Sequence, residues 1–324
     1  MPGNNNATSP GSLPSLSALA QQDRVKPDEM PIGQILGNGQ FKLMELVQNH
    51  PALGLTYNAI NQKGDGFIVK VDAEANLLSF IRSEAGFLQA VNKAGKCEFF
   101  VEFIHGAKFK SWIYFVARFR PGPSINDCWC SSPSGKLTVG SASRVAYFYF
   151  KAIEVVHSLG YLLRRVDPNV IKFDASTRQI YLSDLSSIRL DPSKLQMELP
   201  AKWAGAPIYA PLVHHQGKPH STRSDLEPVI YLLVEMTVGQ LPWEGTPPDL
   251  LGSVKRRSVT KQTLFNDCPP QYAAIYQYIS LLGDSDKIEF ADIYSKLEEV
   301  WKSAGIKKVD DQFDWEERMK KFEQ

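Results

Sequence analysis

Short apolar runs separated by turn residues fill the chain between about residues 40 and 120. They are rich in β-branched and aromatic residues, which predicts strands. The runs are "FKLMELV" (41–47), "LGLTYNAI" (53–60), "GFIVKVDA" (66–73), "FFVEFIHGAKF" (99–109) and "SWIYFVARF" (111–119). One segment between them, residues 76–95, has apolar residues near one helical face, with Leu77 at its start and Gly95 as its stop signal.

The pattern changes after Pro121 and Gly122 to apolar residues at helical spacing. Residues 141–160 are a clear example, and residues 223–239 and 269–282 predict further helices. Residues 223–239 are apolar on most faces, which indicates a central helix. The expected architecture is therefore α+β and bilobal, with a small β-rich lobe, a larger helical lobe and a linker near residues 117–124.

The two ends of the chain differ from this pattern. Residues 1–30 are rich in Asn, Ser, Pro and Gly, which predicts a disordered N-terminal tail. We assign residues 31–310 to one bilobal domain, divided near residue 118, and residues 311–324 to a C-terminal tail of acidic and basic residues.

Charge and cysteine content narrow the possible functions. The formal net charge of +1 gives no global field that would favour nucleic acid or a membrane surface as partner. The 4 cysteines form no C-x-x-C pair, and no secretory signal is visible, so we expect reduced thiols and a cytoplasmic or nuclear protein.

Several motifs follow one another in the order found in protein kinases. "FIVK" (67–70) is similar to the V-A-I-K strand, with Lys70 as the lysine that contacts phosphate. Glu84 lies on the following helix, where a kinase holds the glutamate that pairs with that lysine. "YLSDLSSIR" (181–189) resembles the D-F-G segment with Asp184 as the metal ligand, and Asp225 resembles the buried anchor of the central helix.

Three further segments narrow the resemblance. They are "GPSINDC" (122–128), "RSDLE" followed by "GQLPW" (223–243), and "DDQFDWEE" (310–317). The first two resemble the casein kinase 1 group, and the third resembles the acidic ending of its tau-tubulin kinase branch. The resemblance covers roughly residues 40–317 and implies a protein-kinase-like fold.

The catalytic loop departs from this family. Kinases carry H-R-D-L-x-x-x-N where this chain has "LRRVDPNV" (163–170). Arg165 takes the place of the catalytic Asp and cannot accept a proton. Asp167 replaces the lysine that faces phosphate, and Val170 replaces the metal-binding Asn and offers no oxygen ligand. We expect Arg165 and Asp167 to form a salt bridge that keeps the loop folded, with a role for Asp167 as surrogate base as the alternative.

The nucleotide-binding motifs are partly kept. Of the glycine-rich loop only Gly54 remains in "NHPALGLT" (49–56), and D-F-G has become "DLS" (184–186). The retained Gly54, Lys70, Glu84 and Asp184 imply residual binding of ATP with magnesium at Asp184. The alternative is that these charges only hold the helix to the sheet.

Two other clusters, one of basic residues and one of histidines, could bind ions. Lys255, Arg256 and Arg257 form a basic run in a region where casein kinase 1 members favour acidic substrates, which makes them candidates for anion binding. His214, His215 and His220 match no standard metal spacing, so a solvated loop is the expected reading.

The function implied is that of a casein kinase 1-like pseudokinase that binds protein partners through its C-terminal lobe in signalling. The alternative is an active serine/threonine kinase with a non-standard catalytic loop. A third possibility is a nucleotide-sensing switch without turnover.

Overall fold

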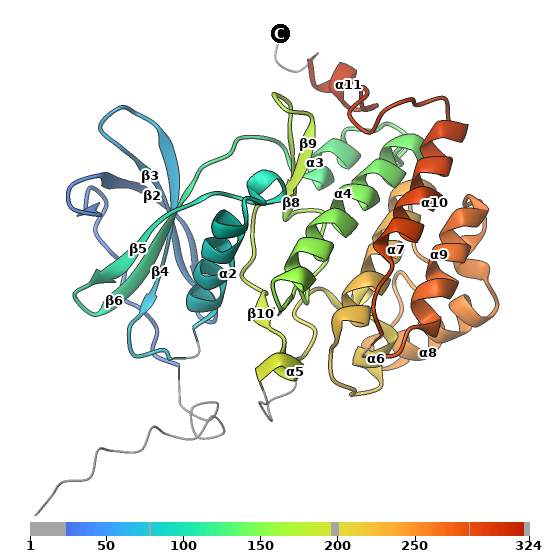
Figure 1. Cartoon of the computed structure of the whole chain (residues 1–324), viewed down its shortest axis with the longest axis horizontal. Helices are drawn as coiled ribbons and strands as arrows, with labels where there is room; N and C mark the ends of the chain where they lie inside the picture. The colour runs from blue at the N-terminus through green and yellow to red at the C-terminus, as the bar shows by residue number, and fades with distance from the viewer. Residues whose placement is uncertain (1–23, 78, 196–200, 285, 321–324) are drawn as a thin grey trace, which may run out of the picture.

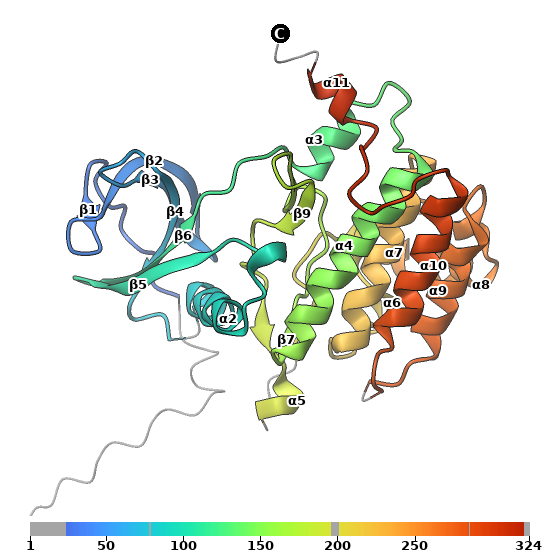
Figure 2. The ribbon, with the colours of Figure 1, turned by 45° about the horizontal axis from the view of Figure 1, so that its top comes forward.

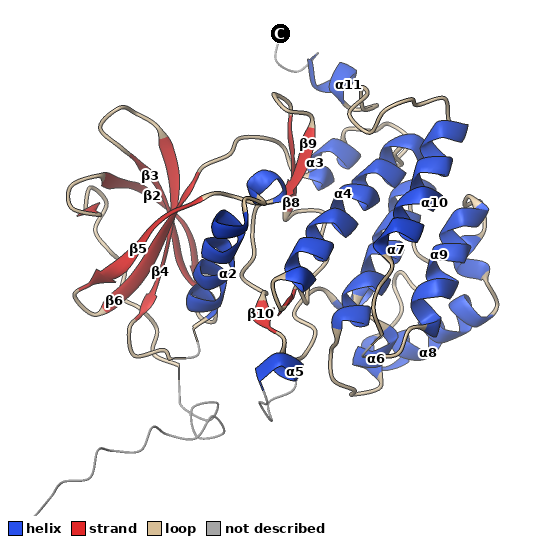
Figure 3. Ribbon diagram, viewed as in Figure 1, coloured by secondary structure: helices blue, strands red, loops and turns tan. Residues whose placement is uncertain are grey.

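The structure, a computed structural model, describes residues 24–77, 79–195, 201–284 and 286–320. The chain forms the expected β-rich and helical lobes, which Figures 1 and 3 show on the left and right. Most of the N-terminal tail predicted to be disordered lies outside the described residues. Among the described residues no helix is both long enough and apolar enough to cross a membrane.

The N-terminal lobe is built on an antiparallel sheet of 6 strands in the order β1-β2-β3-β4-β6-β5. The strands are β1 (Ile35–Leu36), β2 (Phe41–His50), β3 (Gly54–Ile60), β4 (Gly66–Ala73), β5 (Phe103–Phe109) and β6 (Trp112–Arg118). All five predicted strands are present. The fourth run (99–109) forms a shorter strand than predicted, because Cys97–Phe99 forms a short 3-10 helix before β5 begins.

Helix α2 (Phe80–Ala94) follows β4 and packs on this sheet (Figure 2). Ser79 caps its start by accepting the N–H of Ile81, and Gly95 ends it in the left-handed region, as predicted. Leu77 was expected on the apolar face of this helix. It instead precedes the helix and is 53% exposed.

The C-terminal lobe is mainly helical. Its helices are α3 (Ile125–Cys130), α4 (Val139–Ser158), α5 (Pro192–Leu195), α6 (Leu212–His215), α7 (Thr222–Val238), α8 (Pro248–Thr260), α9 (Pro270–Leu281), α10 (Phe290–Ser303) and α11 (Glu316–Lys320). Short strands lie at the lobe interface, where β8 (Ile171–Asp174) pairs with β9 (Gln179–Leu182) and β7 (Tyr161–Leu162) pairs with β10 (Arg189–Leu190).

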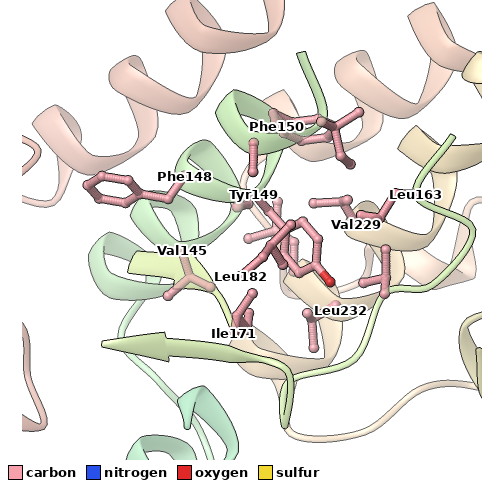
Figure 4. Close-up of a cluster of buried hydrophobic side chains, with 14 of the residues drawn as sticks. Val145, Phe148, Tyr149, Phe150, Leu163, Ile171, Leu182, Val229 and Leu232 are labelled. Atoms are coloured by element: carbon pink, nitrogen blue, oxygen red, sulfur yellow. The ribbon is translucent and has the colours of Figure 1, made fainter. Parts of the chain in front are cut away.

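The core of this lobe lies between α4, α7 and the β8–β9 hairpin. Figure 4 shows Val145 and Tyr149 of α4 facing Ile171, Leu182 and the apolar side of α7. Helix α7 is buried along most of its length, as its uniformly apolar sequence predicted. This rigid base positions the loop between β7 and β8, which contains the altered catalytic motif.

The linker between the lobes is pinned to the β8–β9 hairpin. Arg120 Nε lies 2.8 Å from Asp174 Oδ2, and the Arg120 guanidinium stacks over the Tyr181 ring. A Cβ at Gly122 would lie 2.1 Å from the carbonyl oxygen of Phe173, and the φ of Gly122 is +145°. Only glycine therefore allows this close approach of linker and hairpin.

Both chain ends are more closely packed than the sequence suggested. Residues 24–30, assigned to the disordered tail, lie on the N-terminal lobe, where the backbone N–H of Met30 donates to Tyr57 Oη at 2.8 Å. In the C-terminal tail Phe313 and Trp315 are only 1% and 0% exposed and pack edge-to-face against Phe173 of β8.

A buried arginine holds this C-terminal segment in place. Arg144 of α4 is fully buried, donates to the backbone carbonyls of Val309, Asp311 and Gln312, and lies 3.9 Å from the Phe313 ring centre. Carbonyl oxygens thus replace water around the guanidinium. The domain therefore extends past residue 310, and the last described helix, α11, lies beside α3 (Figure 2).

We expect the Trp315→Ala variant to lower the free energy of unfolding by about 3–5 kcal/mol, because it removes a fully buried aromatic side chain. Urea denaturation measures this change. The exposed Glu317 in the same segment provides the control, since Glu317→Ala should stay within about 0.5 kcal/mol of wild type. Equal small effects for both variants would mean that the segment is a detachable tail.

Candidate functional site

The retained ionisable residues meet between the lobes. Lys70 Nζ of β4 lies 2.7 and 2.8 Å from the two carboxylate oxygens of Glu84 on α2 and 2.7 Å from Asp184 Oδ1. The structure thus brings together the lysine, glutamate and aspartate that the resemblance to protein-kinase motifs implied. Glu84 also accepts the backbone N–H of Leu185, which ties α2 to the segment after β9.

Arg165, in the catalytic aspartate's position, joins this cluster. Its Nη1 lies 3.0 Å from Asp184 Oδ2, and its Nη2 lies 2.7 Å from Asp167 Oδ2. The expected salt bridge between Arg165 and Asp167 is therefore present. The second contact, with Asp184, was not predicted, because nothing in the sequence places residues 165 and 184 within hydrogen-bond distance.

Asp184 has its oxygens fully engaged. Besides Lys70 and Arg165, it accepts hydrogen bonds from the backbone N–H and the hydroxyl of Ser186, both at 3.1 Å. Four donors match the four acceptor positions of a carboxylate. A magnesium ion at Asp184 would have to displace one of these donors.

The charges of the cluster stabilise one another. Burial opposes the charged form of Asp184, but the neighbouring Lys70 and Arg165 outweigh it and hold the pKa of Asp184 well below its usual range. The pKa of Lys70 is raised, because the attraction of Asp184 and Glu84 outweighs burial. Burial raises the pKa of Glu84. The cluster is thus a chain of alternating charges that runs from Glu84 through Lys70, Asp184 and Arg165 to Asp167.

Asp167 is also occupied. Its Oδ1 accepts the backbone N–H and the side-chain amide of Asn169, both at 2.9 Å, while its Oδ2 is paired with Arg165. Burial raises its pKa, but these hydrogen bonds outweigh burial and leave the pKa of Asp167 lowered. A carboxylate with a lowered pKa and engaged oxygens is a weak candidate for a general base.

In the loop between β2 and β3 the backbone N–H donors are bonded within the loop itself. The backbone N–H groups of Ala52 and Leu53 both donate to His50 Nδ1 at 3.1 Å, and Pro51 has no N–H. Gly54 packs tightly on β4, where an added Cβ would lie 2.4 Å from the carbonyl oxygen of Val71. Packing therefore explains the retained glycine without any phosphate.

Two apolar side chains also make the site less suited to binding ATP with magnesium. Ile68 lies on the same face of β4 as Lys70, in the position where V-A-I-K has the smaller alanine. Val170 is buried, and its carbonyl oxygen accepts hydrogen bonds from the backbone N–H and the hydroxyl of Ser183. Protein kinases hold ATP with magnesium through loop amides, a free DFG aspartate and an asparagine. The residues of this chain do not fit that group.

The catalytic loop nevertheless keeps its anchor. Asp225 of α7, fully buried, accepts the backbone N–H groups of Leu163 and Arg164 at 2.8 and 2.7 Å. It also pairs with His157 Nε2 at 3.0 Å and His220 Nε2 at 2.7 Å. The expected role of Asp225 as anchor is confirmed. His157 is a core histidine, and His220 lies buried in the same cluster and not in a solvated loop as expected.

The basic run on α8 is split by the helix. Arg256 and Arg257 are exposed, but Lys255 is fully buried and donates to the carbonyls of Pro207 and Ala210 at 2.8 and 2.7 Å. Lys255 is therefore not part of a surface anion site, and that part of the prediction is wrong. Its position on the inner face of α8 is what separates it from its two neighbours.

Metal binding finds no support in the part of the chain that the structure describes. There, no group of three or more His, Cys, Asp or Glu side chains is arranged to hold a metal ion. His214 is exposed and His215 is half-buried beside Gly252, so the histidine run converges on no common point.

Comparison with known proteins places this geometry in context. No family model matches the chain. It is similar to a probable serine/threonine-protein kinase of Dictyostelium discoideum, with 28% identity over 257 residues, covering 77% of this chain and 50% of that protein. It is also 26% identical to the piRNA biogenesis factor prde-1 of Caenorhabditis elegans over 230 residues, covering 66% of this chain and 44% of that protein.

A probable casein kinase I homolog of Encephalitozoon cuniculi is 27% identical over 174 residues, covering 50% of this chain and 57% of that protein. The chain thus spans about half the length of the curated relatives it matches. Among solved structures, vaccinia related kinase 3 superposes with a TM-score of 0.71 at 19% identity, covering 88% of this chain and 94% of that one. The expected bilobal, protein-kinase-like fold is confirmed.

We expect Lys70→Met to destabilise the fold by about 3–5 kcal/mol, because it leaves the carboxylate of Glu84, 2% exposed, without its partner. The double variant Lys70→Met with Glu84→Leu should recover most of this loss, since the buried Glu84 carboxylate is removed together with its partner. Urea denaturation checks both variants against the exposed control Lys63→Met. A single variant as stable as that control would show that the pair does not hold α2.

We expect stability to rise with pH through a contribution from Lys255. Burial lowers the pKa of Lys255 to about 7. Between pH 7 and the ordinary lysine pKa of about 10.4, the unfolded chain binds a proton that the folded chain does not, so raising the pH favours folding.

The measurement is the thermal unfolding midpoint at pH 6.5 and pH 9 for wild type and Lys255→Met. The variant removes the titrating group and should show a smaller rise than wild type. Identical pH profiles would contradict the lowered pKa of Lys255, because other titrating groups are common to both proteins.

Proposed function

Because this chain belongs to the protein kinase-like superfamily, we propose that it is a catalytically inactive member that acts by binding other proteins. One observation carries the proposal: the Arg165 guanidinium lies between the carboxylates of Asp184 and Asp167. A side-chain cation thus takes the place that a metal ion and a catalytic base would need. The loss of a general base alone typically costs about 10²–10⁴ in rate.

Residual binding of ATP with magnesium was an expectation from the retained residues. The engaged oxygens of Asp184, the loop amides bonded to His50 and the bulk of Ile68 all argue against it. We therefore propose that this protein works without magnesium–ATP, although kinases of its superfamily bind this cofactor.

The finer relationship is also a proposal. The segments at 122–128 and 310–317 resemble the casein kinase 1 group and its tau-tubulin kinase branch, and the Encephalitozoon cuniculi relative bears the casein kinase I name. The Caenorhabditis elegans relative is named for piRNA biogenesis, so kinase-like sequences of this kind also occur in proteins named for another role. A protein-binding role in signalling, through the C-terminal lobe and in the cytoplasm or nucleus, is consistent with both.

An active serine/threonine kinase is the alternative. It would need Asp167 as the base, and both oxygens of Asp167 are already hydrogen-bonded. To free Oδ2 of Asp167, Arg165 would have to leave that carboxylate, which would lose its charged partner.

The test is phosphotransfer from labelled ATP to casein with magnesium or manganese. Wild type and Asp184→Asn should give the same background incorporation. Incorporation that disappears in Asp184→Asn would overturn the proposal, because contaminating kinases are unaffected by this substitution. A variant that combines Arg165→Asp, Asp167→Lys and Val170→Asn restores the family residues and serves as the second comparison.

Thermal stability separates an inert scaffold from a nucleotide switch. A ligand that binds only the folded state raises the unfolding midpoint. We expect no rise with ATP, with or without magnesium, in wild type. A rise in the absence of phosphotransfer would favour the nucleotide-sensing switch.

A further inference from the structure

The segment Arg24–Met30, here called the strap, crosses the N-terminal lobe before β1. It is held along its length by side chains of the sheet. Trp112 Nε1 donates to the carbonyl of Asp28 at 2.9 Å, and Tyr57 Oη accepts the N–H of Met30. Asn49 Nδ2 donates to Glu29 at 2.6 Å. The strap is therefore part of the folded lobe.

The first residue of the strap joins two parts of the lobe. Arg24 Nε donates to the carbonyl of Pro51 at 2.8 Å, and Arg24 Nη2 lies 2.9 Å from Asp72 Oδ1. Pro51 belongs to the loop between β2 and β3, and Asp72 is near the end of β4. Hydrogen bonds between ionised groups are stronger than neutral ones, and Asp72 is 0% exposed.

Asp72 in turn controls the start of α2. Its carboxylate also accepts hydrogen bonds from the backbone of Ala73 and from the side chains of Asn76 and Ser79. Ser79 is the residue that caps α2. Asn76 is tied back to the strap, because it exchanges two hydrogen bonds with the backbone of Val25 at 3.0 and 2.8 Å.

The contacts of Arg24 thus reach two elements of the lobe. One is the loop at Pro51, which continues into Gly54 and packs near Ile81 of α2. The other is α2 itself, which carries Glu84 and therefore one end of the Lys70 ion pair. We propose that the strap is a conformational restraint: through Arg24 and Asp72 it fixes the β2–β3 loop and the start of α2 together, so that loss of the Arg24 contacts loosens both.

Arg24 is partly exposed, but its charge has a large effect on local stability because its partner Asp72 is fully buried. Without it the buried carboxylate of Asp72 keeps only neutral donors, and an incompletely paired buried charge is costly. The first response available to the protein is to open the region around Asp72 to water, which means fraying the start of α2 and lifting the loop at Pro51. The contact of Lys70 with Asp184 shares no hydrogen bond with Arg24.

Hydrogen–deuterium exchange of the full chain with Arg24→Ala tests this coupling. We expect roughly tenfold faster exchange of amides in residues 50–57 and 79–88, as loss of about 1.4 kcal/mol of local stability would give. Exchange in α7 should be unchanged. Arg118→Ala is the matched control, because Arg118 forms an exposed ion pair with Glu102 elsewhere in the same lobe.

Two results would overturn the proposal. One is exchange in Arg24→Ala no faster than in Arg118→Ala, and the other is faster exchange throughout both lobes, which would indicate general destabilisation. Arg24→Lys keeps the charge but loses the forked geometry, so it should give a smaller local acceleration and serves if the alanine variant folds poorly. The readout is independent of catalysis, so its outcome is separate from that of the phosphotransfer test.

Discussion

A carboxylate enclosed between two lobes needs a cation beside it, and in this protein both cations beside Asp184 come from the chain itself. In an active kinase that requirement is met partly by magnesium, which arrives with the nucleotide. Here Lys70 and Arg165 supply the positive charge permanently. The interface between the lobes is therefore electrostatically complete in the absence of any ligand.

This completeness explains why the substitutions in the catalytic loop belong together. Arginine at position 165 would sit beside a lysine at position 167 in the family pattern, and two cations would repel. Aspartate at 167 removes that repulsion and orients the guanidinium toward Asp184. With the metal role taken, the asparagine position is free to become Val170, which is buried with apolar neighbours. The loss of one catalytic residue thus makes the other changes physically consistent.

Much of this arrangement could be predicted from residue patterns. Apolar periodicity predicted the strands, helices and two lobes, because burial depends on which face each residue occupies. The Arg165–Asp167 pair was predictable, since the two residues are close in sequence. The Asp184 contact of Arg165 and the role of Arg24 were not, because they join residues 19 and 48 positions apart. Lys255 shows that neighbouring residues can also be misassigned. A run of like charges predicts a surface patch, but Lys255 lies on the inner face of α8 and is buried.

The packing of both chain ends, like the ion cluster, restrains elements that would have to move in an active kinase. Catalysis by a kinase requires its lobes to open for nucleotide exchange, and such motion draws on weakly held elements. In this protein Arg24, in the N-terminal segment, holds the β2–β3 loop and α2. Phe313 and Trp315, in the C-terminal segment, hold the β8–β9 hairpin. The hairpin is also fastened to the linker through Arg120. A scaffold gains from such restraint, because a preformed surface binds a partner without the entropic cost of ordering it. The same contacts that would hinder an enzyme would thus favour the protein-binding role proposed above.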